Sequence, residues 1–212
     1  MFFEPLGTEN GPTTEERPTF PVWSAPPSSE TGGVIALERI IARSANVVVL
    51  LPSVRVFRSG CMLEIEVVSR QGDLSEEDWW DLSMWAHGFG PPVGRQLPDK
   101  LLRMGVRYRD GTKVTTIEQH RETRLADQQP SGPLLTWWPE GGGPRGGGVF
   151  NFDRSTLWLW PLPPPEPFEF AVEWPLAGIN LTTTELDGTL LSTAAARSTQ
   201  FWPDDDAPAE RD

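Results

Sequence analysis

Hydrophobic and polar residues alternate along several parts of the chain. The clearest case is segment 167–174, where every second side chain is large and apolar: Phe168, Phe170, Val172 and Trp174. The residues between them include Glu169 and Glu173. A period of two is typical of a β-strand with one face on a core and the other in water. Residues 60–70 show the same alternation, so the sequence predicts a second strand of this kind.

The remaining apolar segments also favour short strands. We expect further strands at 34–42, 46–57, 101–109, 112–118, 134–138 and 150–160. In the first of these the spacing of Leu37 and Ile40 also fits a short helix, but the β-branched content favours a strand. The second is either one strand interrupted at Pro52 or a pair of strands, because proline cannot donate to a central ladder. The third and fourth form a hairpin that turns at Asp110-Gly111.

Two helices complete the predicted elements. Ser75 is a favourable N-cap for a short helix that ends at Trp85 and partly covers one end of the core. A second helix begins at Asp187 or Thr189 and ends near residue 199. Its expected inward side chains are Leu190, Leu191, Ala194 and Phe201. The sequence thus predicts a mainly β chain, an antiparallel β-sandwich of about eight strands for which an immunoglobulin-like form is one option.

The composition indicates an interior filled by aromatic rings. The 212 residues include ten Trp, ten Phe, 20 Gly and 22 Pro. Each aromatic side chain buries about 150–250 Å², so few are needed, and frequent Gly and Pro favour short strands. We expect residues 1–30 to be a flexible Pro- and Glu-rich arm, 31–202 a single β-rich domain, and 203–212 an acidic tail. Within the arm, the apolar patch at 20–23 is expected to dock onto the domain.

The formal net charge of −12 is concentrated at the two ends of the chain. Residues 1–30 and 203–212 carry −4 each, which leaves −4 for the domain between them. Nonspecific binding to nucleic acid needs clustered Lys and Arg and is therefore disfavoured. No apolar stretch approaches the roughly 20 residues of a membrane helix, and the N-terminus lacks a signal-peptide pattern. We expect a soluble cytoplasmic protein without a membrane partner.

Cysteine and histidine offer little for redox or metal chemistry. Cys61 is the only cysteine, and the alternation of 60–70 places it on the buried side as a small core residue. His87 and His120 are far apart in the sequence and form no zinc motif. The acidic segment 73–81 matches no calcium-binding loop. We expect no metal and no cofactor.

One predicted strand face concentrates positive charge. Arg103, Arg107 and Arg109 point to the same side of their strand, with Lys113 beyond the turn, and segment 95–124 carries a net charge of +4. In the simpler interpretation this is a solvated strand face. In the functional interpretation it is a docking surface for a partner protein or for an acidic tail of this chain.

A glycine tract at 141–148 is the second candidate site. It lacks the GK[ST] and GxGxxG patterns of phosphate-binding loops, and Pro144 removes one backbone donor. The simpler interpretation is a flexible hairpin tip. As a binding loop, the tract would place Arg145 at its tip and Trp137 and Trp138 at its base.

Three functions remain, in decreasing order of support. The first is a non-catalytic protein-interaction or scaffolding module, supported by the arginine face and the acidic ends. The second is a small-ligand or carbohydrate-binding module in which exposed tryptophans are stacking platforms. The third is an enzyme of unrecognised type, which needs His87 or His120 beside a carboxylate in a cleft. The sequence leaves the oligomeric state open.

Three landmarks carry a family resemblance: GGVIALERIIARS, LWLWPLPPPEPFEFAVEWPLAGI and the closing FWP. In this order they resemble a family of uncharacterised actinobacterial proteins, over residues 20–203. The resemblance implies one compact β-rich domain in a bacterial cytoplasm. It transfers no activity and no site residue.

Overall fold

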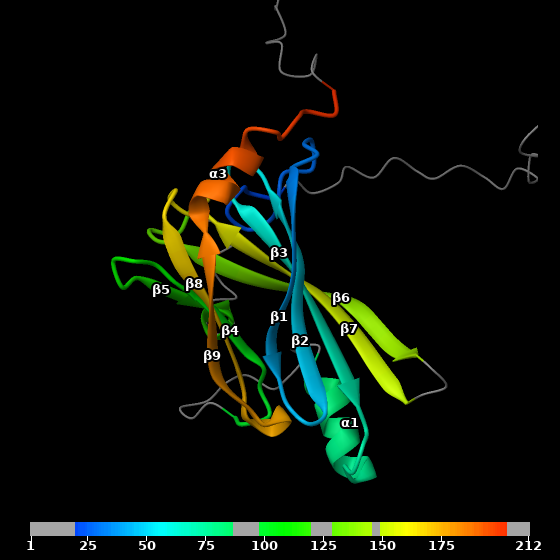
Figure 1. Ribbon diagram of the computed structural model, residues 1–212. Coiled ribbons are helices and arrows are strands. Elements are labelled where there is room, and N and C mark those ends of the chain that lie inside the picture. The colour runs from blue at the N-terminus through cyan, green and yellow to red at the C-terminus, as the bar shows by residue number, and fades with distance from the viewer. Residues whose placement is uncertain (1–19, 87–97, 120–128, 146–148, 203–212) are drawn as a thin grey trace, which may run out of the picture.

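Nine β-strands and three α-helices occur in the computed structural model, which describes residues 20–86, 98–119, 129–145 and 149–202 (Figure 1). The strands are β1 (Gly33–Arg43), β2 (Val47–Val56), β3 (Cys61–Arg70), β4 (Arg103–Arg107), β5 (Lys113–Thr115), β6 (Leu134–Arg145), β7 (Phe150–Trp160), β8 (Pro167–Trp174) and β9 (Ile179–Asp187). The helices are α1 (Glu76–Trp85), α2 (Thr116–Gln119) and α3 (Gly188–Ala195), with one 3₁₀ turn, η2 (Pro175–Ala177).

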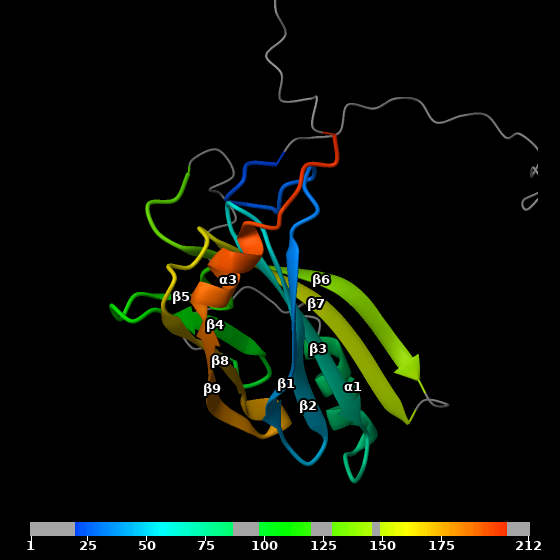
Figure 2. The ribbon, with the colours of Figure 1, turned by 45° about the horizontal axis from the view of Figure 1, so that its top comes forward.

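The described strands form two antiparallel sheets. The five-stranded sheet has the order β1-β2-β3-β7-β6, and the four-stranded sheet has the order β5-β4-β8-β9. The sheets face each other across a common core, with α3 at one end of the molecule and α1 at the other (Figures 1 and 2). The predicted antiparallel β-sandwich with a mid-chain and a C-terminal helix is confirmed. Its immunoglobulin-like form is not.

Apolar side chains from alternating strand positions fill the core. The four inward residues predicted on β8, from Phe168 to Trp174, are all buried. Cys61 on β3 is also buried, as predicted, and this burial raises the pKa of its thiol to about 12. The indole N–H of Trp174 donates to the backbone oxygen of Lys100 at 2.8 Å. The alternation in the sequence therefore predicted correctly which face of these strands is inside.

A segment preceding β1 covers part of the outer face of the five-stranded sheet. Trp158 lies on this outer face of β7, between two core residues, and yet it is fully buried. Its Nε1 donates to the backbone oxygen of Val22 at 3.2 Å, and its ring packs edge-to-face on Phe57 with centroids 5.8 Å apart. Phe20 makes a similar contact with Trp138 at 6.4 Å. The predicted docking of residues 20–23 onto the domain is confirmed.

Both predicted helices begin at their predicted caps. Ser75 Oγ accepts a hydrogen bond from the backbone N–H of Asp78 at 3.1 Å, before α1. Asp187 Oδ1 accepts one from the backbone N–H of Thr189 at 2.8 Å, before α3. The first cap satisfies an N–H that has no partner within α1, and the second does the same for α3.

Some side chains of the helical regions differ from the prediction. Leu191 is buried, whereas its neighbour Leu190 is exposed. The side of α3 that faces the core is formed by Leu191, Ala194 and Ala195, and Leu190 lies outside it. Phe201, which follows α3, is also exposed and packs edge-to-face on Trp202. On α1, Trp79 and Trp85 pack against the core, as expected of a helix that partly covers it, whereas Trp80 is exposed.

Three segments of backbone also differ from the prediction. Residues 141–145 continue β6 as a strand paired with β7, and are not a flexible tip, because the ladder uses backbone groups that glycine retains. Residues 116–119 form α2 instead of extending β5. β9 has no predicted counterpart, because a run of three threonines hides its alternation. For residues 47–56 the prediction left two options, and the structure has the first of them, one strand with a register shift around Pro52.

Candidate functional site

The outer face of the four-stranded sheet carries charges whose sign depends on the strand. Four positively charged side chains lie on the β4–β5 half: Arg103, Arg107, Arg109 and Lys113. Four negatively charged side chains lie on the β8–β9 half: Glu169, Glu173, Glu185 and Asp187. We call this surface the divided face. Asp110 lies at the tip of the β4–β5 turn, beyond both halves.

The strand register places four of these charges in one row across the sheet. Arg107 lies opposite Lys113 on β5 and opposite Glu169 on β8. Glu169 in turn lies opposite Glu185 on β9. Directly opposite residues have Cβ atoms about 4.5–5.5 Å apart, so each side chain of the row can interact with the next. Across the sheet the row has two positive charges followed by two negative charges.

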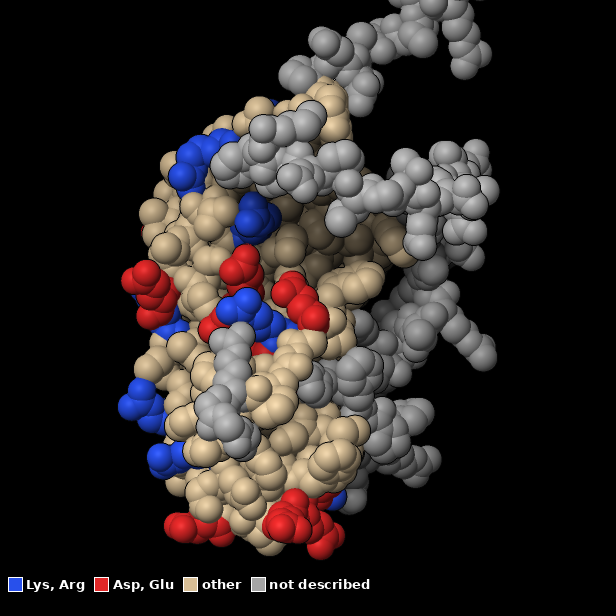
Figure 3. Space-filling view, turned by 90° about the vertical axis from the view of Figure 1, so that its right-hand side faces the viewer, with Lys and Arg blue, Asp and Glu red and all other residues tan. Residues whose placement is uncertain are grey.

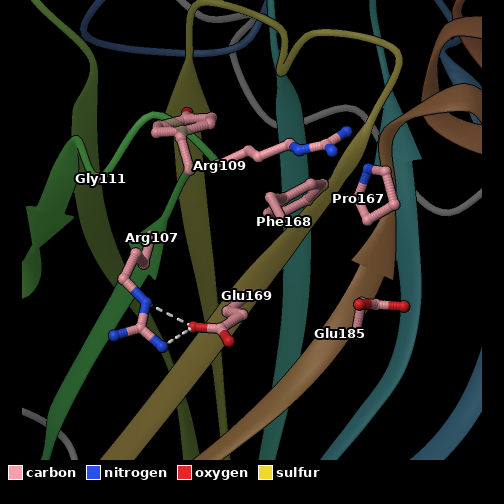
Figure 4. Close-up of a pocket in the computed structure, with 8 residues that line it drawn as sticks. Arg107, Arg109, Gly111, Pro167, Phe168, Glu169 and Glu185 are labelled. Atoms are coloured by element: carbon pink, nitrogen blue, oxygen red, sulfur yellow. Dashed lines mark hydrogen bonds and ion pairs between the residues drawn. The ribbon is translucent and has the colours of Figure 1, made fainter.

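The inner charges of the divided face neutralise each other. Arg107 donates from Nε and Nη2 to Oε2 of Glu169 (Figure 4). Arg103 and Glu173, which also face each other across β4 and β8, form a second ion pair with Nη1 and Oε2 2.6 Å apart. Arg103 also donates to the backbone oxygen of Pro98 at 3.0 Å, and 15% of its side chain is exposed. Two of the three predicted arginines are therefore held by glutamates of the neighbouring strand.

The two ends of the row have neighbours of like charge. Lys113 lies beside Arg107, and Glu185 lies beside Glu169. Neither the amine of Lys113 nor the carboxylate of Glu185 has an ion-pair partner among the described residues. Like charges that face each other directly on a sheet are destabilising. Among the described residues, the row therefore ends in a positive charge without an ion pair on β5 and a carboxylate without an ion pair on β9. The Arg39 guanidinium lies near this second end, because it donates to the backbone oxygen of Glu185 at 3.0 Å.

A cavity of about 510 Å³ opens where β4 and β8 separate. The ladder between these strands ends at Arg107 and Glu169, and Pro167, the first residue of β8, has no N–H with which to extend it. Arg109 extends over this opening in the direction of Pro167, whereas Arg107, which also lines the cavity, points toward Glu169 (Figure 4). The two arginines therefore have different surroundings although they are two residues apart.

Aromatic side chains line the same cavity. The rings of Tyr108 and Phe168 have centroids 6.2 Å apart. Burial raises the pKa of the Tyr108 phenol above its ordinary value, so this side chain stays neutral at physiological pH. Arg109 has no ion-pair partner among the described residues. Glu169 and Glu185 also line the cavity, and Glu169 is paired with Arg107. A carboxylate-bearing side chain can therefore enter only at the Arg109 end, where it would pair with this guanidinium and pack on the rings.

A row of small side chains lies beside the charged row. Gly105 lies opposite Thr115 on β5 and Ala171 on β8, and Ala171 lies opposite Thr183 on β9. These four residues line a shallow depression of about 180 Å³. Its rim includes Leu181, which is 67% exposed. The middle of the divided face is therefore low enough for another protein surface to approach closely.

The other predicted site residues do not join the arginines. Trp137 points into the core, whereas Trp138 is 41% exposed on the outer face of the opposite sheet. The backbone of Arg145 ends β6, and its side chain lies outside the described residues, as do His87 and His120. On the side of the molecule where β6 and β7 lie, charges of both signs occur in small groups between broad uncharged areas (Figure 3).

The negative half of the divided face is the part that sequence reasoning missed. Glu169 and Glu173 are evident from the alternation of β8, but Glu185 and Asp187 depend on β9. A signal for β9 is present, because Thr183 and these two acidic residues occupy every second position. Threonine is also enriched in strands.

Two negative findings apply to the residues that the structure describes. None of the helices in that part of the chain has the length and apolar character needed to cross a bilayer. In the same part of the chain, no group of three or more His, Cys, Asp or Glu side chains is arranged to hold a metal ion.

Comparisons with protein-family models, with curated proteins and with solved structures gave no match for this chain. The resemblance to actinobacterial proteins gains no support from them. The function is therefore inferred from the divided face.

Proposed function

We propose that the protein is a non-catalytic interaction module whose divided face binds a protein partner. The proposal rests on one observation, the unsatisfied charge on both halves of this face. Arg109, Lys113 and Glu185 are exposed and lack ion-pair partners among the described residues. A partner of complementary charge would satisfy all three at once. Complementary charges of this kind orient two proteins and accelerate their encounter.

The extent of the divided face favours a protein over a small molecule. Its charges extend over all four strands, whereas a small ligand occupies a single concave site. The cavity beside Arg109 then has a narrower role, as the place where one acidic side chain of the partner is held. Arginine and tyrosine, which both line this cavity, are enriched at protein interfaces.

The paired and unpaired arginines have separate roles in this proposal. Arg103 and Arg107 hold Glu173 and Glu169 in position, so their first contribution is to the sheet. Arg109 and Lys113 are available to the partner. A test that reverses all three arginines would confuse loss of folding with loss of binding, and the informative substitutions are those at the unpaired positions.

The tryptophan-based alternative has less support. A carbohydrate platform needs exposed rings on one surface, but among the described residues Trp137 is turned inward and Trp138 packs beside Phe20. Trp80 is exposed on α1, which is a different element. The aromatic residues that line the 510 Å³ cavity are Tyr108 and Phe168, so tryptophan does not contribute to this cavity either.

The proposal is tested by capture from the native host with charge-reversed variants. The Arg109→Glu/Lys113→Glu variant is expected to lose proteins that co-purify with the wild type. The matched control is Arg43→Glu/Arg58→Glu, which changes the net charge equally at two exposed arginines that also lack ion pairs with described residues. Recovery of the same proteins with both variants would contradict the proposal.

Site-specific photo-crosslinking gives a second, independent measurement. A photoreactive residue at Leu181 on the rim of the divided face is expected to form crosslinks to a partner. The same residue at Ile40 on β1, which is 50% exposed, is the control on the opposite sheet. Crosslinks from the Ile40 position alone would move the docking surface to the other sheet.

A further inference from the structure

The two halves of the divided face are complementary to each other in charge. The β4–β5 half has four positive side chains, the β8–β9 half has four negative ones, and the boundary runs between β4 and β8. A surface divided in this way is complementary to a copy of itself that is turned over. Closed dimers with two-fold symmetry use such self-complementary surfaces.

The strand order determines which two-fold axis brings opposite charges together. Consider an axis in the plane of the interface, parallel to the strands and between β4 and β8. Rotation about it places β5 over β9 of the second copy and β4 over its β8, and each row of side chains stays over the same row. An axis across the strands would instead place each strand over its own copy, with like charges in contact. Only the first arrangement is electrostatically favourable.

This arrangement satisfies the charges that lack an ion-pair partner among the described residues of one chain. Lys113 lies over Glu185 of the second copy, and the symmetry repeats that contact. Arg107 lies over Glu169 of the second copy, so the two intrachain ion pairs join into a cluster of alternating sign. Arg109 extends over the opening at Pro167, beside Asp187 of the second copy. The row of small residues with Gly105 at its centre lets the two sheets approach.

The like-charged neighbours give an independent reason to expect a partner on this face. Lys113 beside Arg107 and Glu185 beside Glu169 reduce the stability of the isolated chain. Exchanging the residues at positions 113 and 185 would remove both repulsions within the chain. Local features that destabilise the isolated chain, such as these like-charged neighbours, are expected at functional surfaces, where a binding partner can neutralise them.

We infer that the divided face binds a second copy of this chain, forming a symmetric dimer with its axis parallel to the strands. The inference rests on the proposed function and names the partner. Four short strands are expected to bury less area than the roughly 1,600 Å² of a standard interface, so the dimer is weak, with a dissociation constant in the micromolar range. The ion pairs at its rim make it sensitive to salt.

The decisive experiment uses two single charge reversals, Lys113→Glu and Glu185→Lys, in the full chain. Each is expected to weaken self-association by about tenfold or more in sedimentation equilibrium, because each places like charges at two symmetric contacts. Lys113→Glu is expected to fold at least as well as the wild type, since it places an opposite charge beside Arg107. Glu185→Lys removes the repulsion with Glu169 but places an amine near Arg39, whose guanidinium donates to the backbone oxygen of residue 185, so it is expected to fold about as well as the wild type. Unfolding curves recorded on the same samples check this.

Mixing the two variants tests the geometry itself. The introduced glutamate of one chain faces the introduced lysine of the other, and the second contact keeps its native pair. An equimolar mixture is therefore expected to form a heterodimer of about wild-type affinity, and the double variant Lys113→Glu/Glu185→Lys is expected to dimerise again. Ion pairing also predicts that about 1 M salt dissociates the dimer, because the screening length then falls to about 3 Å.

Three results would overturn the inference. One is a chain that stays monomeric up to about 1 mM, which is far above the concentration that a micromolar affinity requires. Another is a dimer that both single reversals leave intact. The third is a mixture of the two reversals that fails to associate. If the chain is monomeric but Arg109→Glu/Lys113→Glu still loses a captured partner, the proposed function stands and the second copy is excluded.

Discussion

Part of the outer face of the five-stranded sheet is covered by the segment that precedes β1, and we call this part the covered face; the charged side chains of the divided face on the four-stranded sheet include several that are exposed. On the first, Trp158 is fully buried by the segment that precedes β1. On the second, the charged side chains are divided by sign between two pairs of strands and lie beside a row of small uncharged residues. Both sheets use the same kind of inner face, so the difference lies entirely in the outward positions.

This difference separates stability from recognition. Burying aromatic area on an outer face stabilises the fold and removes that face from solvent. Ion pairs that remain exposed contribute little to stability but can determine orientation and the choice of partner. We therefore expect substitutions on the covered face to change the free energy of unfolding, and substitutions on the divided face to change association.

The largest effect is expected at the covered face. Trp158→Ala removes a fully buried ring and leaves a cavity, so the free energy of unfolding is expected to fall by about 3–5 kcal/mol. Urea denaturation followed by circular dichroism measures this. The control is Trp138→Ala on the same sheet, where partial exposure limits the loss to about 1 kcal/mol. Equal losses would contradict the view that the cover stabilises the fold.

A pH series examines the interior that both sheets share. Burial raises the pKa of the Cys61 thiol from 9.0 to about 12, so the folded state keeps a proton that the unfolded chain loses. The contribution of this thiol to the free energy of unfolding is fully present below pH 9. It is lost as the pH rises toward 12, by about 1.4 kcal/mol for each pH unit. The raised pKa of Tyr108 acts in the same direction. Cys61→Ala is expected to reduce this slope, and an unchanged slope would exclude a contribution from the thiol.

Removing the cover tests its contribution directly. A chain that begins at Glu30 lacks the carbonyl of Val22 that accepts from Trp158, and it exposes that ring. We expect a red shift of the tryptophan fluorescence and a loss of about 1–3 kcal/mol in the free energy of unfolding. A chain lacking only residues 1–19 is the control that assigns the effect to 20–29. Unshifted fluorescence in the shorter chain would show that Trp158 is shielded by other residues.

The smallest effects are expected within the divided face. Glu173→Gln removes the closer of two carboxylates that pair with the mostly buried Arg103, the other being Asp99 at 3.8 Å, and is expected to cost about 1–2 kcal/mol. Glu169→Gln leaves Arg107, half of whose side chain is exposed, so about 0.5 kcal/mol is expected. Paired urea denaturation curves compare the two variants. A larger loss of unfolding free energy for Glu169→Gln than for Glu173→Gln would show that the Arg107 pair, and not the Arg103 pair, contributes more to the stability of the sheet.

The alternation of apolar residues was sufficient to predict most strands. It located β3, β8 and the buried side of Cys61, and the capping residues located the starts of α1 and α3, because period and capping are local properties of the sequence. It could not predict that 141–145 would join β6, since glycine has no side chain to show a face. It also missed β9, where three threonines suit a strand but give no apolar alternation.

The divided face depends on contacts between distant parts of the sequence. The arginines of β4 are visible as a cluster, but their partners on β8 are more than 60 positions away. Only the antiparallel register places Glu173 opposite Arg103 and Glu169 opposite Arg107. The sequence alone therefore suggested a cationic surface. In the fold, the positive side chains of the divided face equal the negative ones in number, and the two signs lie on opposite halves.

The prolines of β6 have a consequence for aggregation. β6 is the last strand of the five-stranded sheet, and such edges can recruit further strands and seed fibrils. Pro139 and Pro144 lie within β6 and have no N–H to offer to an incoming strand. Any strand added along this edge would therefore meet gaps in its ladder. The same glycine- and proline-rich stretch that pairs with β7 thus protects the sheet from uncontrolled growth.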